Sequence, residues 1–209
     1  MSTRIKICGV TRPDDGLCAA ELGADAIGLV FFAGSPRHVD LDTASRIIAV
    51  LPPLTTVVAL FQDPTAAAVE QVVAELPVDL LQFHGGESPE FCRRFGRRYL
   101  KALAMAGGRA AAQAQARQYP DAAGFLLDSH AVGQQGGSGQ VFDWSQIPAD
   151  LNRPYLLAGG LSPDNVADAI RQHRPYGVDV SSGVEAARGI KDAVKMAAFI
   201  SEVKRVESE

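Results

Sequence analysis

The chain has 209 residues, 47% of them hydrophobic, which is enough for one large domain or two small ones with a substantial core. Its 20 Lys and Arg residues and 24 Asp and Glu residues give a net charge of −4, and no basic run favours nucleic acid or an anionic membrane. The longest apolar stretches, such as Ala26 to Ala33, fall far short of the roughly 20 residues of a membrane span. Composition therefore predicts a cytoplasmic protein whose partner is a small molecule.

Short runs rich in Val, Ile, Leu and Phe alternate along the chain with longer stretches of helical periodicity. This alternation is typical of repeated βα units around a parallel sheet. Eight runs are predicted to be strands: Arg4 to Cys8, Ala26 to Phe31, Thr56 to Phe61, Leu80 to Phe83, Leu100 to Leu103, Gly124 to Leu127, Tyr155 to Ala158 and Gly177 to Val180. They are apolar almost throughout, as expected for parallel strands that are buried on both faces.

Several predicted helices carry start signals, in which capping residues and an early proline come before an amphipathic stretch. The signals are Thr11-Arg12-Pro13-Asp14, Asp63-Pro64-Thr65, Ser88-Pro89-Glu90 and Ser162-Pro163-Asp164. No Pro/Ser-rich boundary divides the chain, so we expect a single domain over residues 1–209.

Eight βα units can close into a barrel or lie open as a doubly wound sheet. An open sheet that binds a dinucleotide usually has a GxGxxG turn after its first strand, and the turn Cys8-Gly9-Val10-Thr11 lacks it. Units of about 26 residues suit a small barrel with short loops. We therefore predict a (β/α)8 TIM barrel, with one long glycine-rich loop from Ser129 to Phe142.

The cysteines and histidines show neither CxxC spacing nor a metal-ligand pattern, so we expect no disulfide framework and no structural zinc. They are Cys8, Cys18, Cys92, His38, His84, His130 and His173. Cys18 and Cys92 fall in helical stretches, where a cysteine commonly serves as a small buried hydrophobic residue. Cys8 differs because it ends the first strand.

The active site of a (β/α)8 barrel lies at the carboxyl ends of its strands. After strands seven and eight, glycines and serines leave backbone N–H groups open near helix starts, an arrangement suited to phosphate. The candidate phosphate-binding residues are Gly159, Gly160, Ser181, Ser182 and Gly183. The alternative is that these glycines only permit tight turns.

Cys8 and Asp128 are the candidates for proton transfer. Lys6 alternates with Cys8 and so shares its barrel face, where its charge could favour the thiolate. An Asp that closes an apolar strand could keep its proton and act as an acid. The alternatives are a packed thiol at Cys8, a structural ion pair at Lys6 and a helix cap or turn at Asp128.

Polar residues at other strand ends are candidates for substrate binding. Arg37 lies in a short polar loop and suits bidentate binding of a carboxylate, the alternative being a solvated surface charge. Gln82, His84 and Asp179 occupy comparable places, and Lys6 is a further candidate for substrate binding. A structural role for His84 through hydrogen bonds is favoured over metal binding, because no partner lies at ligand spacing.

At these residues the sequence resembles the phosphoribosylanthranilate isomerase family of tryptophan biosynthesis. The matching segments run in order along nearly the whole chain. They are Lys6-Ile7-Cys8-Gly9-Val10-Thr11, Gly28-Leu29-Val30-Phe31-Phe32 with Ser35-Pro36-Arg37, Gln82-Phe83-His84-Gly85, Leu127-Asp128, Gly136-Gly137-Ser138-Gly139 with Phe142-Asp143-Trp144, Leu157-Ala158-Gly159-Gly160-Leu161 with Asn165-Val166, and Asp179-Val180-Ser181-Ser182-Gly183-Val184-Glu185.

The resemblance implies an isomerase that needs no metal or organic cofactor. Its reaction is an Amadori rearrangement of N-(5-phosphoribosyl)anthranilate into 1-(o-carboxyphenylamino)-1-deoxyribulose 5-phosphate. Asp128 would be the general acid that helps open the ribose ring, and Cys8 the general base that removes the sugar C2 proton. Arg37 would face the anthranilate carboxylate, and Asp179 would lie near the amino and hydroxyl groups of the substrate. Gly160, Ser182 and Gly183 would belong to the phosphate cradle.

Two other functions are compatible with such a barrel. A histidine-pathway isomerase acts on a phosphoribosyl aminoimidazole carboxamide by the same rearrangement, but that family uses an Asp at the first-strand position and carries a half-barrel repeat. Cys8 and the lack of a clear repeat argue against it. A non-catalytic barrel that only binds a phosphorylated ligand would not need Cys8, Asp128 and Arg37 together. A monomer and a homodimer both agree with the sequence.

Overall fold

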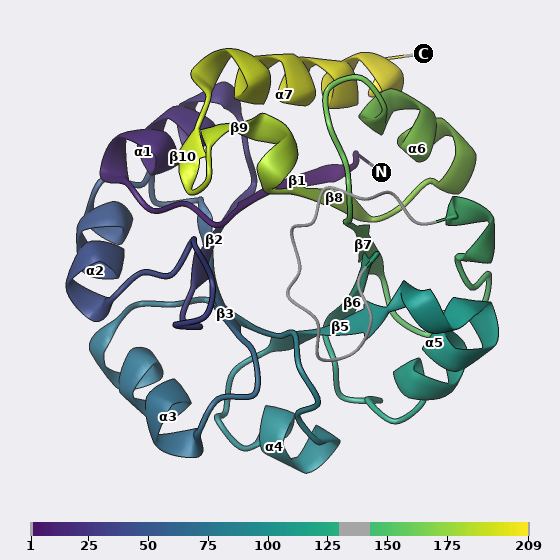
Figure 1. Cartoon of the computed structure of the whole chain (residues 1–209), viewed down its shortest axis with the longest axis horizontal. Helices are drawn as coiled ribbons and strands as arrows, with labels where there is room; N and C mark the ends of the chain where they lie inside the picture. The colour runs from purple at the N-terminus through teal and green to yellow at the C-terminus, as the bar shows by residue number, and fades with distance from the viewer. Residues whose placement is uncertain (1, 130–142, 209) are drawn as a thin grey trace.

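The computed structural model of the protein describes residues 2–129 and 143–208. Eight parallel strands form a closed barrel, in which neighbours in the chain pair and the last strand pairs with the first. In Figure 1 the strands ring the centre and the helices surround them. The strands are β1 (Arg4–Cys8), β2 (Ala26–Val30), β3 (Thr56–Phe61), β4 (Leu80–Phe83), β5 (Tyr99–Ala104), β6 (Gly124–Asp128), β7 (Tyr155–Leu157) and β8 (Gly177–Val180). The predicted (β/α)8 barrel is confirmed.

The predicted strand limits differ from the observed ones by no more than one residue at either end. Two residues predicted to end strands, Phe31 and Ala158, lie just beyond β2 and β7. Both still donate a backbone hydrogen bond to the neighbouring strand, from Phe31 to Leu60 and from Ala158 to Leu127. The apolar runs therefore predict the positions of the paired strands well, and predicted and observed strands differ only in their end residues.

Seven α-helices lie outside the barrel among the described residues: α1 (Pro13–Leu22), α2 (Leu41–Ala49), α3 (Ala66–Glu75), α4 (Pro89–Arg93), α5 (Gly108–Ala116), α6 (Val166–His173) and α7 (Ala193–Glu207). The short 3-10 helices are η1 (Met105–Gly107), η2 (Trp144–Gln146) and η3 (Ser182–Val184). A small antiparallel hairpin of β9 (Glu185–Ala187) and β10 (Ile190–Lys191) comes before α7. The predicted loop from Ser129 to Phe142 lies outside the described residues after Ser129.

Of the four predicted helix start signals, two supply a side chain that caps the helix, and the other two make different contacts. Ser88 and Thr65 accept hydrogen bonds from the third backbone N–H beyond them, as N-caps do. Before α1, the Thr11 hydroxyl instead donates to the Gly189 carbonyl of the β9–β10 hairpin. The helix predicted from Ser162 begins later, because the side chain of Asn165 accepts from the Ser162 N–H and holds a turn there.

Alternate residues of each strand point outward and inward. The outward side chains, such as Ile5 and Ile7 of β1, pack with the inner faces of the helices in the largest hydrophobic cluster. Smaller clusters fill the inside of the barrel, and one of them contains Cys8. Lys6 and Cys8 therefore share the inner face, so the alternation of an apolar strand directs its few polar side chains into the barrel.

None of the helices in the described part of the chain is long and apolar enough to cross a membrane.

Candidate active site

A pocket opens at the carboxyl ends of the strands and brings together residues from far apart in the chain. The predicted site residues that line it are Cys8, Arg37, Gln82, His84, Asp128, Asp179 and Ser181. Phe32, Leu60 and Gln62 also line it and were not predicted as site residues. Gln62 follows the end of β3, so the strand-end rule that selected the other residues would also have selected it.

Lys6 lies below this pocket in a buried ion pair. The register of β1 and β8 places it opposite Asp179, and its Nζ is 2.8 Å from Asp179 Oδ1. Burial has the largest single effect and lowers the pKa of Lys6, but the charges of Asp179 and Cys8 and the hydrogen bonds to them together outweigh burial and raise the pKa. Lys6 thus forms the structural ion pair that was its alternative role from the sequence. This pair fixes the carboxylate of Asp179 at the floor of the pocket.

The Cys8 thiol is buried where β1 meets β2. Gly28 pairs with it in register, and a Cβ at Gly28 would lie 2.8 Å from Cys8 Sγ and 3.1 Å from Lys6 Nζ. Burial raises the pKa of Cys8, and the opposing charge of Lys6 does not overcome it. The charge of Lys6 and its hydrogen bond do lower the pKa of Cys8, as expected from the sequence, but burial and the negative charge of Asp179 outweigh them in the free protein.

Asp128 ends β6 and is surrounded by polar groups. Its Oδ1 accepts from the Ser129 N–H at 2.6 Å, and its Oδ2 lies 3.4 Å from His84 Nε2. The other ring nitrogen of His84 is 3.2 Å from Gln82 Nε2. Gln82 of β4 and His84, which follows β4, thus form a polar row that reaches Asp128 at the apolar end of β6. That burial keeps the proton on Asp128 stays a prediction.

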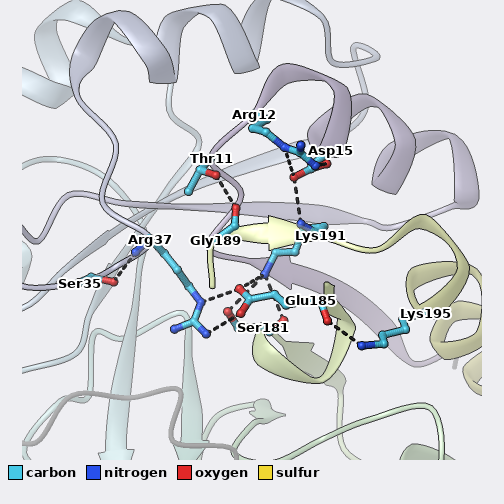
Figure 2. A network of polar contacts seen from close by, with 10 residues as sticks. All are labelled: Thr11, Arg12, Asp15, Ser35, Arg37, Ser181, Glu185, Gly189, Lys191 and Lys195. Carbon is cyan, nitrogen blue, oxygen red and sulfur yellow. Dashed lines mark hydrogen bonds and ion pairs between the residues drawn. The ribbon is translucent and has the colours of Figure 1, made fainter. Parts of the chain in front are cut away.

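Arg37 is buried, which excludes the solvated surface charge considered from the sequence. Its Nε and Nη2 donate to the two carboxylate oxygens of Glu185 at 2.7 and 2.8 Å, as Figure 2 shows. These hydrogen bonds raise the pKa of Arg37. The bidentate geometry predicted for Arg37 is present, but its partner here is a carboxylate of the protein itself.

Glu185 and Lys191 form part of the site but were not predicted from the sequence as site residues. Lys191 Nζ lies 3.0 Å from Glu185 Oε1 and donates to the Ser181 carbonyl at 3.1 Å. Both side chains are buried. The signal in the sequence that could have indicated this hairpin is Gly189. Its positive φ of +78° forms the turn that places β9 beside β10.

The loops after β7 and β8 lie against each other, as the phosphate prediction requires. Gly159 and Gly160 both have positive φ values, of +80° and +69°. A Cβ at Gly183 would overlap the Leu161 carbonyl, so the two loops touch there. Ser182 begins η3, where the first backbone N–H groups have no partner within the helix.

A second cavity, of about 690 Å³, lies at the opposite end of the barrel, where the strands begin. It is larger than the carboxyl-end pocket, but Lys6 is the only predicted site residue that lines it. Its rim includes the surface pair of Arg4 and Asp25, which are 2.8 Å apart. The chemistry-bearing side chains therefore favour the carboxyl-end pocket despite its smaller volume. Within the described ranges, no group of three or more His, Cys, Asp or Glu residues is arranged to hold a metal ion.

A closed parallel barrel with its polar pocket at the carboxyl ends of the strands defines the class of (β/α)8-barrel enzymes. Residues 5–202 match the family described as N-(5'phosphoribosyl)anthranilate (PRA) isomerase. The chain belongs to this family and is an isomerase of tryptophan biosynthesis. The match decides between the two biosynthetic pathways considered from the sequence.

Individual relatives agree with the family match. An N-(5'-phosphoribosyl)anthranilate isomerase from Halorhodospira halophila is 54% identical over 205 residues, which cover 98% of each chain. The crystal structure of phosphoribosyl anthranilate isomerase from Thermotoga maritima matches with a TM-score of 0.88 and 38% identity, covering 97% of this chain and 99% of that one. Another structure of the isomerase, in complex with reduced 1-(o-carboxyphenylamino)-1-deoxyribulose 5-phosphate, matches with a TM-score of 0.82 and 33% identity over 97% and 99% of the two chains.

Proposed function

We propose that this chain converts N-(5-phosphoribosyl)anthranilate into 1-(o-carboxyphenylamino)-1-deoxyribulose 5-phosphate, with Asp128 as general acid and Cys8 as general base. The observation that carries the proposal is that Cys8 of β1 and Asp128 of β6 line one pocket, although they are far apart in the sequence. The relative that holds the reduced product supports the choice of ligand. The proposed steps use side chains of the protein only, and we place the reaction in the cytoplasm.

Asp128 acts in the first step. Its carboxyl proton passes to the ring oxygen of the ribose while the bond between that oxygen and C1 breaks. The lone pair of the anthranilate nitrogen forms the C=N bond of a Schiff base, and the ring oxygen becomes a hydroxyl. The contact of His84 with Asp128, supported by the contact between Gln82 and His84, holds Asp128 at the pocket wall for this transfer.

Cys8 acts in the second step. Its thiolate takes the proton from C2, and the electrons of that C–H bond form the C1=C2 bond of an enolamine while the nitrogen becomes neutral. The enolamine then tautomerises to the ketone. Because burial raises the pKa of Cys8, we propose that the positive charge of the Schiff base, formed in the first step, favours the thiolate, and that the thiol proton is released to solvent before the thiolate takes the C2 proton.

Binding groups surround these two residues. Arg37 is proposed to bind the anthranilate carboxylate, and Asp179, fixed by Lys6, to contact the amino and hydroxyl groups of the substrate. The phosphate is proposed to lie on the loops after β7 and β8, at Gly159, Gly160, Ser181, Ser182 and Gly183. Positive φ at the two neighbouring glycines exposes backbone N–H groups there.

A fluorescence assay tests the function directly, because the anthranilate conjugate loses its emission as it reacts. The purified protein should consume N-(5-phosphoribosyl)anthranilate and leave the phosphoribosyl aminoimidazole carboxamide substrate unchanged. Dialysis against a chelator should not alter the rate. Turnover of the aminoimidazole compound alone would reject the proposal.

A further inference from the structure

We propose that Glu185 is a positioning residue for carboxylate recognition: it holds Arg37 so that one edge of the guanidinium faces the pocket. The proposal rests on the assignment of Arg37 to the anthranilate carboxylate. It adds a specific function for the hairpin that follows β8, a segment outside the strand ends at which barrel enzymes usually place their site residues.

A guanidinium has two edges that can each bind a carboxylate with a pair of hydrogen bonds. Glu185 takes the edge formed by Nε and Nη2, at 2.7 and 2.8 Å. No hydrogen bond from Arg37 Nη1 to another described residue is found, and Arg37 lines the pocket. The edge formed by Nη1 and Nη2 is thus left for a ligand. The two hydrogen bonds to Glu185 fix the orientation of this edge.

The charges of the cluster favour one added anion. Arg37 and Lys191 are cations that share the single carboxylate of Glu185, and all three side chains are buried. Among these three groups one positive charge is in excess. A buried charge without a partner is costly, so one carboxylate entering beside Arg37 would balance it, whereas a neutral ring would not.

The position of Glu185 is itself fixed from several sides (Figure 2). Lys195 of α7 donates to its backbone carbonyl at 2.7 Å, and Lys191 donates to its side chain. The Lys191 N–H donates to Asp15 of α1, which ties the hairpin to a second helix. A Cβ at Gly9 would collide with the Arg37 side chain, so Gly9 leaves the space in which that chain lies. The guanidinium is therefore held by rigid elements before any ligand arrives.

Lys191 also connects the two ends of the proposed ligand site. Its Nζ donates to the Ser181 carbonyl, at the start of the loop assigned to phosphate, and to Glu185, which orients Arg37. The carboxylate and phosphate contacts are thus linked through one ammonium group.

The test compares the affinities for two ligands in titration calorimetry. One is reduced 1-(o-carboxyphenylamino)-1-deoxyribulose 5-phosphate, and the other is the same compound made from aniline, without the carboxyl group. The unmodified protein should prefer the carboxylated ligand. Glu185→Gln should reduce this preference about tenfold or more, while its affinity for the carboxyl-free ligand changes by no more than about threefold. In an Arg37→Met background, Glu185→Gln should not reduce the preference further.

Two more variants control for a merely structural effect. Glu70→Gln makes the same chemical change in the exposed ion pair with Arg94 and should leave the preference unchanged. Glu185→Asp keeps the charge but retracts the carboxylate by one methylene. Its preference for the carboxylated ligand should lie between that of the unmodified protein and no preference. This variant keeps the test valid if Glu185→Gln does not fold.

The inference would be overturned if the Glu185 variants lowered the affinity for both ligands equally. It would also be overturned if the unmodified protein did not prefer the carboxylated ligand. Turnover of N-(5-phosphoribosyl)anthranilate by the unmodified protein is measured separately and tests the proposed function alone.

Discussion

Cys8, the proposed general base, combines a position in the carboxyl-end pocket with a raised pKa in the free protein. Its thiol is buried and its pKa is raised, while the nearest cation, Lys6, is paired with Asp179. A neutral thiol in the free protein avoids an isolated buried charge. The proposed base therefore has to be activated by the substrate, through the charge that forms on it.

Removing either proton-transfer group should slow the reaction and leave binding nearly unchanged. Cys8→Ser substitutes a far weaker acid, and Asp128→Asn removes the transferable proton while keeping the shape, so each should lower kcat by about 10² to 10⁴. Steady-state assays and titration with the reduced product would separate kcat from affinity. The double variant should lose less than the product of the two single losses. Near-normal kcat in Cys8→Ser would remove Cys8 from the mechanism.

The raised pKa of Cys8 also predicts how the rate depends on pH. Because the thiolate fraction of the free protein increases as pH approaches that raised pKa, kcat/KM should increase between about pH 7 and pH 9. In Cys8→Ser this increase should disappear from the same range. A flat profile for the unmodified protein would mean that ionisation of Cys8 does not limit the step.

At the scale of elements, the apolar runs predict the strands because strands buried on both faces tolerate few polar residues. The same property makes strand-end residues such as Cys8 and Asp128 recognisable as candidates. Pairings between distant elements leave no comparable local pattern: Arg37 and Glu185 are 148 residues apart. Burial and the fold bring these two together, so the partner of Arg37 emerges only from the structure.

The loops after β7 and β8 carry the prediction about phosphate. Gly160→Leu should weaken substrate binding, because a side chain there would occupy the cradle and its φ of +69° disfavours a residue with a Cβ. KM should increase at least about tenfold, with a smaller effect on kcat. Gly96→Leu is a matched control, since Gly96 also has a positive φ and a Cβ there meets nothing within 4 Å. If inorganic phosphate does not compete with substrate in the unmodified protein, the phosphate assignment is wrong.

At the scale of the whole molecule, stability depends on a buried ion pair that lies outside the proposed active site and that the proposed reaction does not use. Lys101 of β5 lies 2.7 Å from Glu87, and both side chains are buried on the outer side of the barrel. Lys101 also donates to the Gly85 carbonyl, and Tyr119 donates to the Glu87 carbonyl. The pair thus joins the loop after β4 to β5 and to the segment that follows α5.

Lys101→Met should therefore destabilise the whole fold. It leaves the Glu87 carboxylate buried without its cation, a change that costs about 3 to 5 kcal/mol of the free energy of unfolding. Urea denaturation followed by circular dichroism would measure the loss. Arg94→Gln breaks the exposed pair with Glu70 and should cost no more than about 1 kcal/mol, because solvent screens that pair. Replacing both Lys101 and Glu87 by apolar residues should recover part of the loss, since no buried charge then lacks a partner. A Lys101→Met protein as stable as the unmodified one would show that the backbone N–H groups of Asp63 and Gly85, which donate to Glu87, suffice to hold its charge.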